Sequence, residues 1–154
     1  MAGAPGQGGS TVFDERVRLL YRLSLPGYPG TLIISAFVAT VLIAVVPAFK
    51  VMLWLGLSLA VTAVRYRLYR RFCALAPADA ELPRWRHRFV AGAAVMGVVW
   101  GMLGAWLMPD AEFMYQILVM FVIGGMVASA LVVLTPVRLA YYCFAGGALL
   151  PTIA

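Results

Sequence analysis

The sequence predicts an all-α integral membrane protein: a bundle of about five transmembrane helices preceded by an amphipathic helix at the membrane surface. Hydrophobic residues make up 64% of the 154 residues and charged residues only 12%, whereas an average soluble domain carries about 25% charged residues. A soluble fold of this size leaves much of its surface in water. Long apolar runs separated by basic clusters therefore indicate that lipid surrounds most of the chain.

Three regions follow from the pattern along the chain. Residues 1–10 are Gly, Ala, Pro and Gln without periodicity and predict a disordered tail. Residues 11–25 predict an amphipathic juxtamembrane helix, because charged and apolar side chains fall on opposite sides of a helical wheel. Residues 26–154 form the transmembrane domain, which opens with a break at the Pro/Gly-rich residues 26–30.

The positions of prolines and charges divide the transmembrane domain into spans. Thr31 to Val64 contains a single charge, Lys50. One helix of that length would measure about 51 Å, against a hydrocarbon core of about 30 Å. A turn is therefore expected near Pro47 and Lys50. The predicted spans lie near residues 31–46, 48–64, 89–108, 113–134 and 139–154.

The basic residues predict the orientation in the membrane. Eleven of the twelve Lys and Arg residues lie in the leader and on alternate connections, which places the N-terminus in the cytoplasm. Seven arginines of the central connection are expected to set this topology and to contact lipid headgroups. They are Arg65, Arg67, Arg70, Arg71, Arg84, Arg86 and Arg88.

The sequence predicts no catalytic, cofactor-binding or metal-binding residue. No nucleotide-binding loop, HExxH, G-x-S-x-G or kinase signature occurs. Cys73 and Cys143 lie far apart and are expected to be free thiols, and His87 between two arginines is read as an ordinary interfacial residue. All six acids lie outside the apolar spans, which disfavours a pump. The charge of +6 is explained by topology, so nucleic acid is not expected as a partner.

Small residues recur at four-residue spacing in two of the predicted spans and indicate close helix contacts. Packing between neighbouring helices of one chain is favoured over a homodimer, and room for an unidentified small apolar ligand is a further alternative. The residues are Ala93, Gly97, Gly101 and Ala105 in one span, and Gly124, Gly125, Ala128 and Ser129 in the next.

The order of these features resembles the multi-pass N-terminal region of bacterial signalling proteins, namely membrane-bound GGDEF diguanylate cyclases and sensor histidine kinases. The resemblance covers roughly residues 16–154 and rests on short motifs. These are Arg18-Leu19-Leu20-Tyr21-Arg22, the Arg-rich connection, Arg88-Phe89, Gly97-Val98-Val99-Trp100-Gly101 and Gly124-Gly125-Met126. It implies the inner membrane of a bacterium and a cytoplasmic output domain, and it carries no catalytic residue onto this chain.

The sequence hypothesis is therefore a membrane-embedded input or anchoring module of a signalling protein. The chain departs from the family pattern because it lacks a last span, a linker helix and an output domain, so we expect the reading frame to continue beyond Ala154. A GGDEF domain is expected first and a histidine kinase second. The alternatives are a small transporter or channel subunit, and a structural protein acting through helix contacts.

Overall fold

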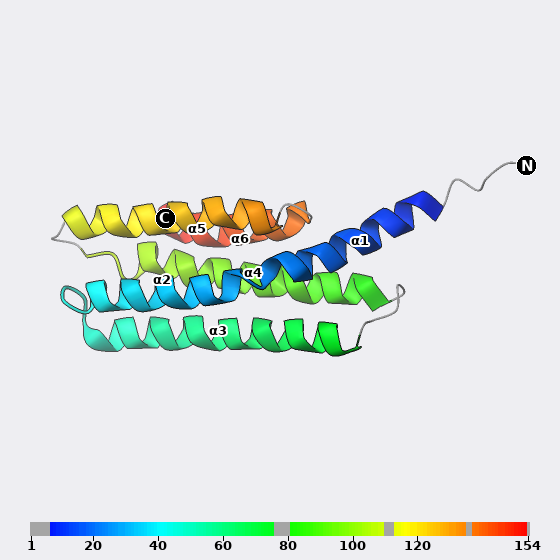
Figure 1. The fold of residues 1–154 in the computed structure, drawn as a ribbon. Helices are drawn as coiled ribbons and strands as arrows, with labels where there is room; N and C mark the ends of the chain where they lie inside the picture. Colours follow the sequence, from blue (N-terminus) through cyan, green and yellow to red (C-terminus); the bar gives the residue numbers. More distant parts are fainter. Residues whose placement is uncertain (1–6, 76–80, 110–112, 135–136, 154) are drawn as a thin grey trace, which may run out of the picture.

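The computed structural model describes residues 7–75, 81–109, 113–134 and 137–153, and all regular structure in these ranges is helical. The helices run side by side in an up-and-down order, with α1 leading into the bundle from one end (Figure 1). Their bounds are α1 Gln7–Ser24, α2 Gly27–Leu42, α3 Ala48–Leu75, α4 Leu82–Ala105, α5 Phe113–Leu134 and α6 Arg138–Ile153.

The expectation of five spans is too high for the structure. Three helices in the described ranges, α3, α4 and α5, are long and apolar enough to cross a membrane. A fourth span results if the end of α1 and the whole of α2, bent by 43° at a short break, count as one. Both α2 and α6 have 16 residues, which is about 24 Å of helix and less than a hydrocarbon core of about 30 Å.

The N-terminal region also differs from its prediction. Helix α1 begins at Gln7, so residues 7–10 of the predicted tail are helical, while residues 1–6 lie outside the described part of the chain. The break predicted at residues 26–30 is shorter in the structure, where only Leu25 and Pro26 separate α1 from α2. Pro29 lies in the first turn of α2. A proline is tolerated there since the first-turn N–H groups have no partner within the helix.

Helix α1 does not lie apart from the bundle as a purely interfacial helix would. Val17, Leu20 and Tyr21 are completely buried or nearly so, and α1 contacts α2, α4 and α5. Leu19 and Leu23 on the neighbouring face remain exposed. The predicted amphipathic pattern is present, but its apolar face packs on protein as well as facing outward.

Helix α4 is the centre of the bundle, and α6 lies on it in the same direction. The small residues predicted to mediate packing bring the two backbones together: Gly97 faces the carbonyl of Phe144, and a Cβ at Gly101 would lie 2.5 Å from the carbonyl oxygen of Gly147. Ala93 in the same row is fully buried, whereas Ala105 at the end of α4 is exposed. The stripe on α4 therefore faces a helix of its own chain.

Polar side chains join α2, α3 and α4 within the apolar bundle. The hydroxyls of Ser35 and Ser58 lie 2.9 Å apart and link α2 to α3. The indole Nε1 of Trp54 donates to the carbonyl of Val99 at 2.7 Å, and the Trp54 ring meets Trp100 edge to face at 5.5 Å. In an apolar environment an unpaired polar group is costly, so these bonds favour one arrangement of the three helices.

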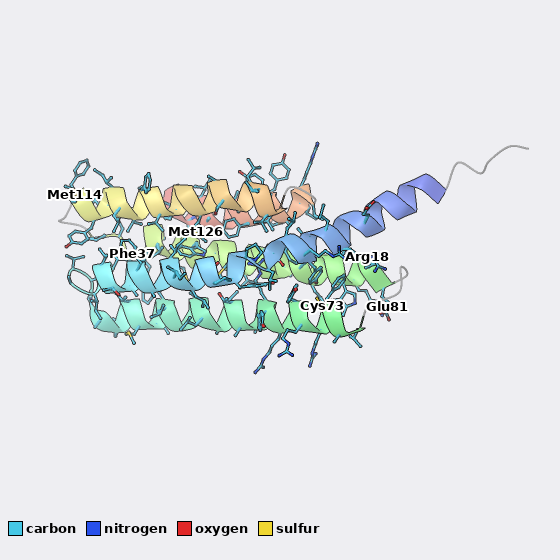
Figure 2. The ribbon with its side chains drawn as sticks, viewed as in Figure 1. Arg18, Phe37, Cys73, Glu81, Met114 and Met126 are labelled. Carbon is cyan, nitrogen blue, oxygen red and sulfur yellow. The ribbon has the colours of Figure 1, made fainter. Side chains whose placement is uncertain are left out.

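The arrangement generates a test of orientation. Cys73 is exposed near the end of α3, and Met114 is exposed at the opposite end of the bundle (Figure 2). In a Cys143→Ser background, we expect a thiol reagent that cannot cross membranes to label Cys73 only after the cells are permeabilised. A Cys73→Ser, Met114→Cys variant should be labelled in intact cells, because the positive-inside rule predicts that the basic end faces the cytoplasm. Labelling with the opposite sidedness would reverse the predicted topology.

The α4–α6 contact generates a second prediction. Gly101→Ile should lower the free energy of unfolding by about 1–3 kcal/mol or more, because its side chain must displace the α6 backbone. Gly56→Ile is the matched control, since no atom lies within 4 Å of a Cβ at Gly56. Thermal unfolding in detergent measures both. Equal losses for the two variants would contradict the close packing of α4 on α6.

Candidate functional site

An aromatic cluster ties α1 to the ends of α3 and α4. The Tyr21 ring stacks on Phe72, with centroids 3.9 Å apart and planes within 3°. Phe89 and Trp85 meet the same ring edge to face at 5.2 and 6.3 Å. The Tyr21 hydroxyl donates to the carbonyl of Trp85 at 3.1 Å. Three helices are therefore joined at the end of the bundle that carries the arginines, called here the basic end.

Arg65 occupies a slot beside this cluster. Its guanidinium lies over the rings of Phe89 and Tyr28, 5.3 and 5.9 Å from their centroids, within the range of cation–π contacts. Its aliphatic stem runs along Gly92, where a Cβ would lie 3.2 Å from Arg65 Cγ. The Tyr28 hydroxyl donates to the Arg65 carbonyl at 3.4 Å. The absence of a side chain at Gly92 and two flat rings thus hold Arg65 half-buried against the bundle.

A cavity of about 330 Å³ opens next to Arg65. It lies where the α1–α2 break, α3, α4, α5 and α6 converge, and Pro26 and Ser129 at its edge are exposed. Its walls are mostly apolar, and the polar residues that line it include Ser24, Thr31 and Arg65. The volume falls within the range of about 300–1,000 Å³ that small-molecule sites occupy. Met126, which lines it, is marked on α5 in Figure 2.

The other predicted arginines do not join this site in the same way. Arg88 lies over the Trp85 ring at 5.2 Å and is exposed, and Arg86 is half-buried and makes contacts of its own. The remaining arginines of the central set are exposed, as expected for residues that face headgroups or water. They are Arg67, Arg70, Arg71 and Arg84.

The small residues of α5 face away from the helices that contact α5. A Cβ at Gly124 or Gly125 would meet no atom within 4 Å, and Ala128 and Ser129 are also exposed. The two small-residue rows thus differ, because the row on α4 is covered by α6 and the row on α5 is not covered by any described part of the chain. Ser129 also donates a hydrogen bond to the carbonyl of Met126, which fixes it at the edge of the cavity.

Sequence reasoning missed the special position of Arg65 and the aromatic cluster. Phe72 and Trp85 were not singled out and Phe89 was named only as part of a motif, although Trp85 and Phe89 are one helical turn apart and share a face. Gly92, one turn further, was the available signal that a long side chain from another helix fits there. Which arginine fills this space depends on the rotation of α3 against α4, which periodicity alone does not give.

The described residues suit binding and conformational coupling. None of their His, Cys, Asp and Glu side chains form a group of three or more that could hold a metal ion. The thiols of Cys73 and Cys143 are free, as expected. Comparisons with protein families, curated proteins and solved structures found no match to this chain.

The cluster generates a prediction for α1. Tyr21→Ala should destabilise the packing of α1 by about 3–5 kcal/mol, because a fully buried aromatic ring is lost. Tyr21→Phe keeps the stacked ring and should cost about 1 kcal/mol for the lost hydrogen bond. Hydrogen exchange of the α1 amides in lipid nanodiscs measures both. Leu19→Ala, on the exposed face of α1, is the control. Equal hydrogen-exchange rates of the α1 amides in all three variants would show that the cluster does not anchor α1.

Proposed function

We propose that this chain is the membrane-embedded input module of a bacterial signal-transduction protein. The resemblance to the membrane regions of diguanylate cyclases and sensor histidine kinases suggests the class of protein. The observation that carries the proposal is structural: the cavity adjoins the break between α1 and α2, and α1 is fastened to the tips of α3 and α4. A change in the conformation of the cavity would therefore alter the position of α1 and of the helix ends that it contacts at the basic end.

The coupling follows from which residues form the cavity wall. Ser24, Pro26 and Gly27 at the 43° break line it, as does Arg65 on α3. An occupant that presses on the break changes the angle at which α1 leaves the bundle. Because Tyr21 is stacked on Phe72, the same movement is transmitted to the end of α3. Shifts of about 1–2 Å are typical of such helix movements in signalling proteins.

A transporter or channel is a weaker alternative. Transport of ions or protons generally uses ionisable groups inside the membrane, whereas the carboxylates among the described side chains, Glu15 and Glu81, are exposed at the basic end. A structural role through helix contacts is the second candidate, because the small residues of α5 are open to another helix. A structural role predicts that the basic end keeps one geometry whatever surrounds or fills the bundle.

Spin labels at Cys73 and at a cysteine replacing exposed Glu15, in a Cys143→Ser background, test the proposal. The Glu15–Cys73 distance distribution, measured by pulsed electron paramagnetic resonance, should shift by about 2 Å between thin and thick or neutral and anionic bilayers. The shift is expected because α1 hinges at Pro26.

The control pair lies at the opposite end of the bundle, with cysteines replacing Phe49 and Met114 in a background without Cys73 and Cys143; both positions are exposed. Its distribution should stay constant, since neither residue adjoins the break. An unchanged Glu15–Cys73 distribution in every bilayer would reject an input role and leave an anchor or a structural protein.

A further inference from the structure

The cavity at the basic end is lined by one cationic side chain together with mostly apolar ones. Its polar end is formed by Arg65 with the hydroxyls of Ser24 and Thr31, and its body by apolar side chains such as Met96 and Phe144. From Leu134 to Met126 it follows eight residues of α5, which corresponds to about 12 Å along the helix axis. It is thus an elongated apolar chamber with one cation at its mouth.

The cation has no anionic partner in the described part of the chain. Glu15 and Glu81, whose carboxylates belong to the described side chains, are exposed and form no ion pair with Arg65. The rings of Tyr28 and Phe89 lie against the flat faces of the guanidinium. They do not accept hydrogen bonds from its N–H groups, which point outward in the plane. A half-buried guanidinium without an acceptor favours a bound anion, because charged groups removed from water need a partner.

The hydroxyls around the cavity are already engaged as donors. Ser24 donates to the carbonyl of Tyr21 and Thr31 to that of Gly27, both at 2.8 Å, and Tyr28 donates to the carbonyl of Arg65. Their oxygens remain available only as acceptors. Recognition of an anion at this end therefore falls to Arg65, whose planar fork suits a carboxylate or phosphate.

The apolar body excludes the simpler ligands. A small inorganic anion on Arg65 would leave the chamber beyond it empty, and a neutral hydrocarbon would leave the guanidinium without a counter-charge. Met96 and Met126 have flexible side chains that adapt to ligands of irregular shape. A volume of about 330 Å³ lies in the range of small-molecule sites and is large enough for an acyl chain.

We propose that this cavity binds one acyl chain of an anionic amphiphile, with the carboxylate or phosphate of its headgroup on Arg65. The exposed rim at Pro26 and Ser129 lets the chain enter between the α1–α2 break and α5. The site lies at the boundary between the apolar part of α3 and its arginine-rich end, which is the depth at which lipid headgroups are found. This inference does not require that the chain signals.

Direct binding to the purified full chain in a non-ionic detergent tests the proposal. A fluorescent fatty acid, cis-parinaric acid, should bind saturably at one site, and oleate should displace it at least ten times more effectively than oleyl alcohol, which has the same chain but no charge. Phosphatidylglycerol is compared with phosphatidylcholine in the same way. Displacement by phosphatidylglycerol identifies a bilayer lipid as the source, and displacement by oleate alone identifies a free fatty acid.

Variants locate the site. Arg65→Gln should weaken binding of the fluorescent acid at least tenfold. In this variant oleate and oleyl alcohol should displace the probe about equally well, because the charge that distinguishes them is gone. Ala130→Phe fills the chamber and should weaken all ligands alike. Arg70→Gln, an exposed arginine on the same helix, is the matched control and should bind as the native chain does.

Three results would overturn the inference. They are non-saturable binding, equal affinity for acid and alcohol in the native chain, or full binding in Ala130→Phe. The first two use the unmodified protein, so they hold even where a variant fails to fold. Saturable binding without any change in the Glu15–Cys73 distance would keep this site and reject the input role, so the two proposals fail separately.

Discussion

The contact between α4 and α6 is the constraint on which the other helices depend. Lipid chains are as apolar as the helices, so tight packing and not water exclusion decides which faces meet. Gly97 and Gly101 have no side chain at the seam, so the backbone carbonyls of Phe144 and Gly147 approach the α4 backbone closely. With α6 seated on α4, helix α5 keeps only Val119, Ile123 and Leu134 buried. The looser fit of α5 leaves room for the cavity between it and the α1–α2 break.

The basic end combines charge and aromatic packing in one place. Arginines at the edge of a membrane protein usually need only reach the headgroups, and most of those in the central connection are exposed. Arg65 is different because Gly92 gives its stem a groove and Tyr28 and Phe89 cover its head. The Phe89 ring also belongs to the network that holds α1 through Tyr21. Topology, helix docking and a candidate binding site therefore share one set of side chains.

Much of the architecture could be predicted from the sequence because breaks between apolar runs are local signals. The turn at Pro47, the start of α3 at Ala48 and the whole of α5 agree with the predicted spans. The number of spans was too high because the predicted spans 31–46 and 139–154, like α2 and α6 in the structure, have only 16 residues, which is short for a helix that crosses a membrane. The helical start at Gln7 and the short break at Pro26 were missed for a related reason, since tertiary contacts override weak local patterns.

The candidate site could not be predicted in the same way. Arg65 and Arg67 are the same residue type and lie two positions apart in the same arginine-rich stretch. Only the rotation of α3 places Arg65 over Phe89 and leaves Arg67 exposed. The row of small residues on α4 was found by its spacing, yet the identical spacing on α5 has no neighbour in the chain. Spacing shows that a close approach is allowed, and the partner is decided by the three-dimensional order of the helices.

The parallel seating of α6 on α4 has a consequence for biosynthesis. The two faces that touch are separated in the chain by the whole of α5, so α4 emerges from the ribosome well before its partner exists. At about 5–20 residues per second, the delay is on the order of seconds. During that time the glycine groove of α4 is open to lipid or to any other helix passing through the insertion machinery. The order in which the helices are released into the bilayer thus governs how many nascent chains reach the native bundle.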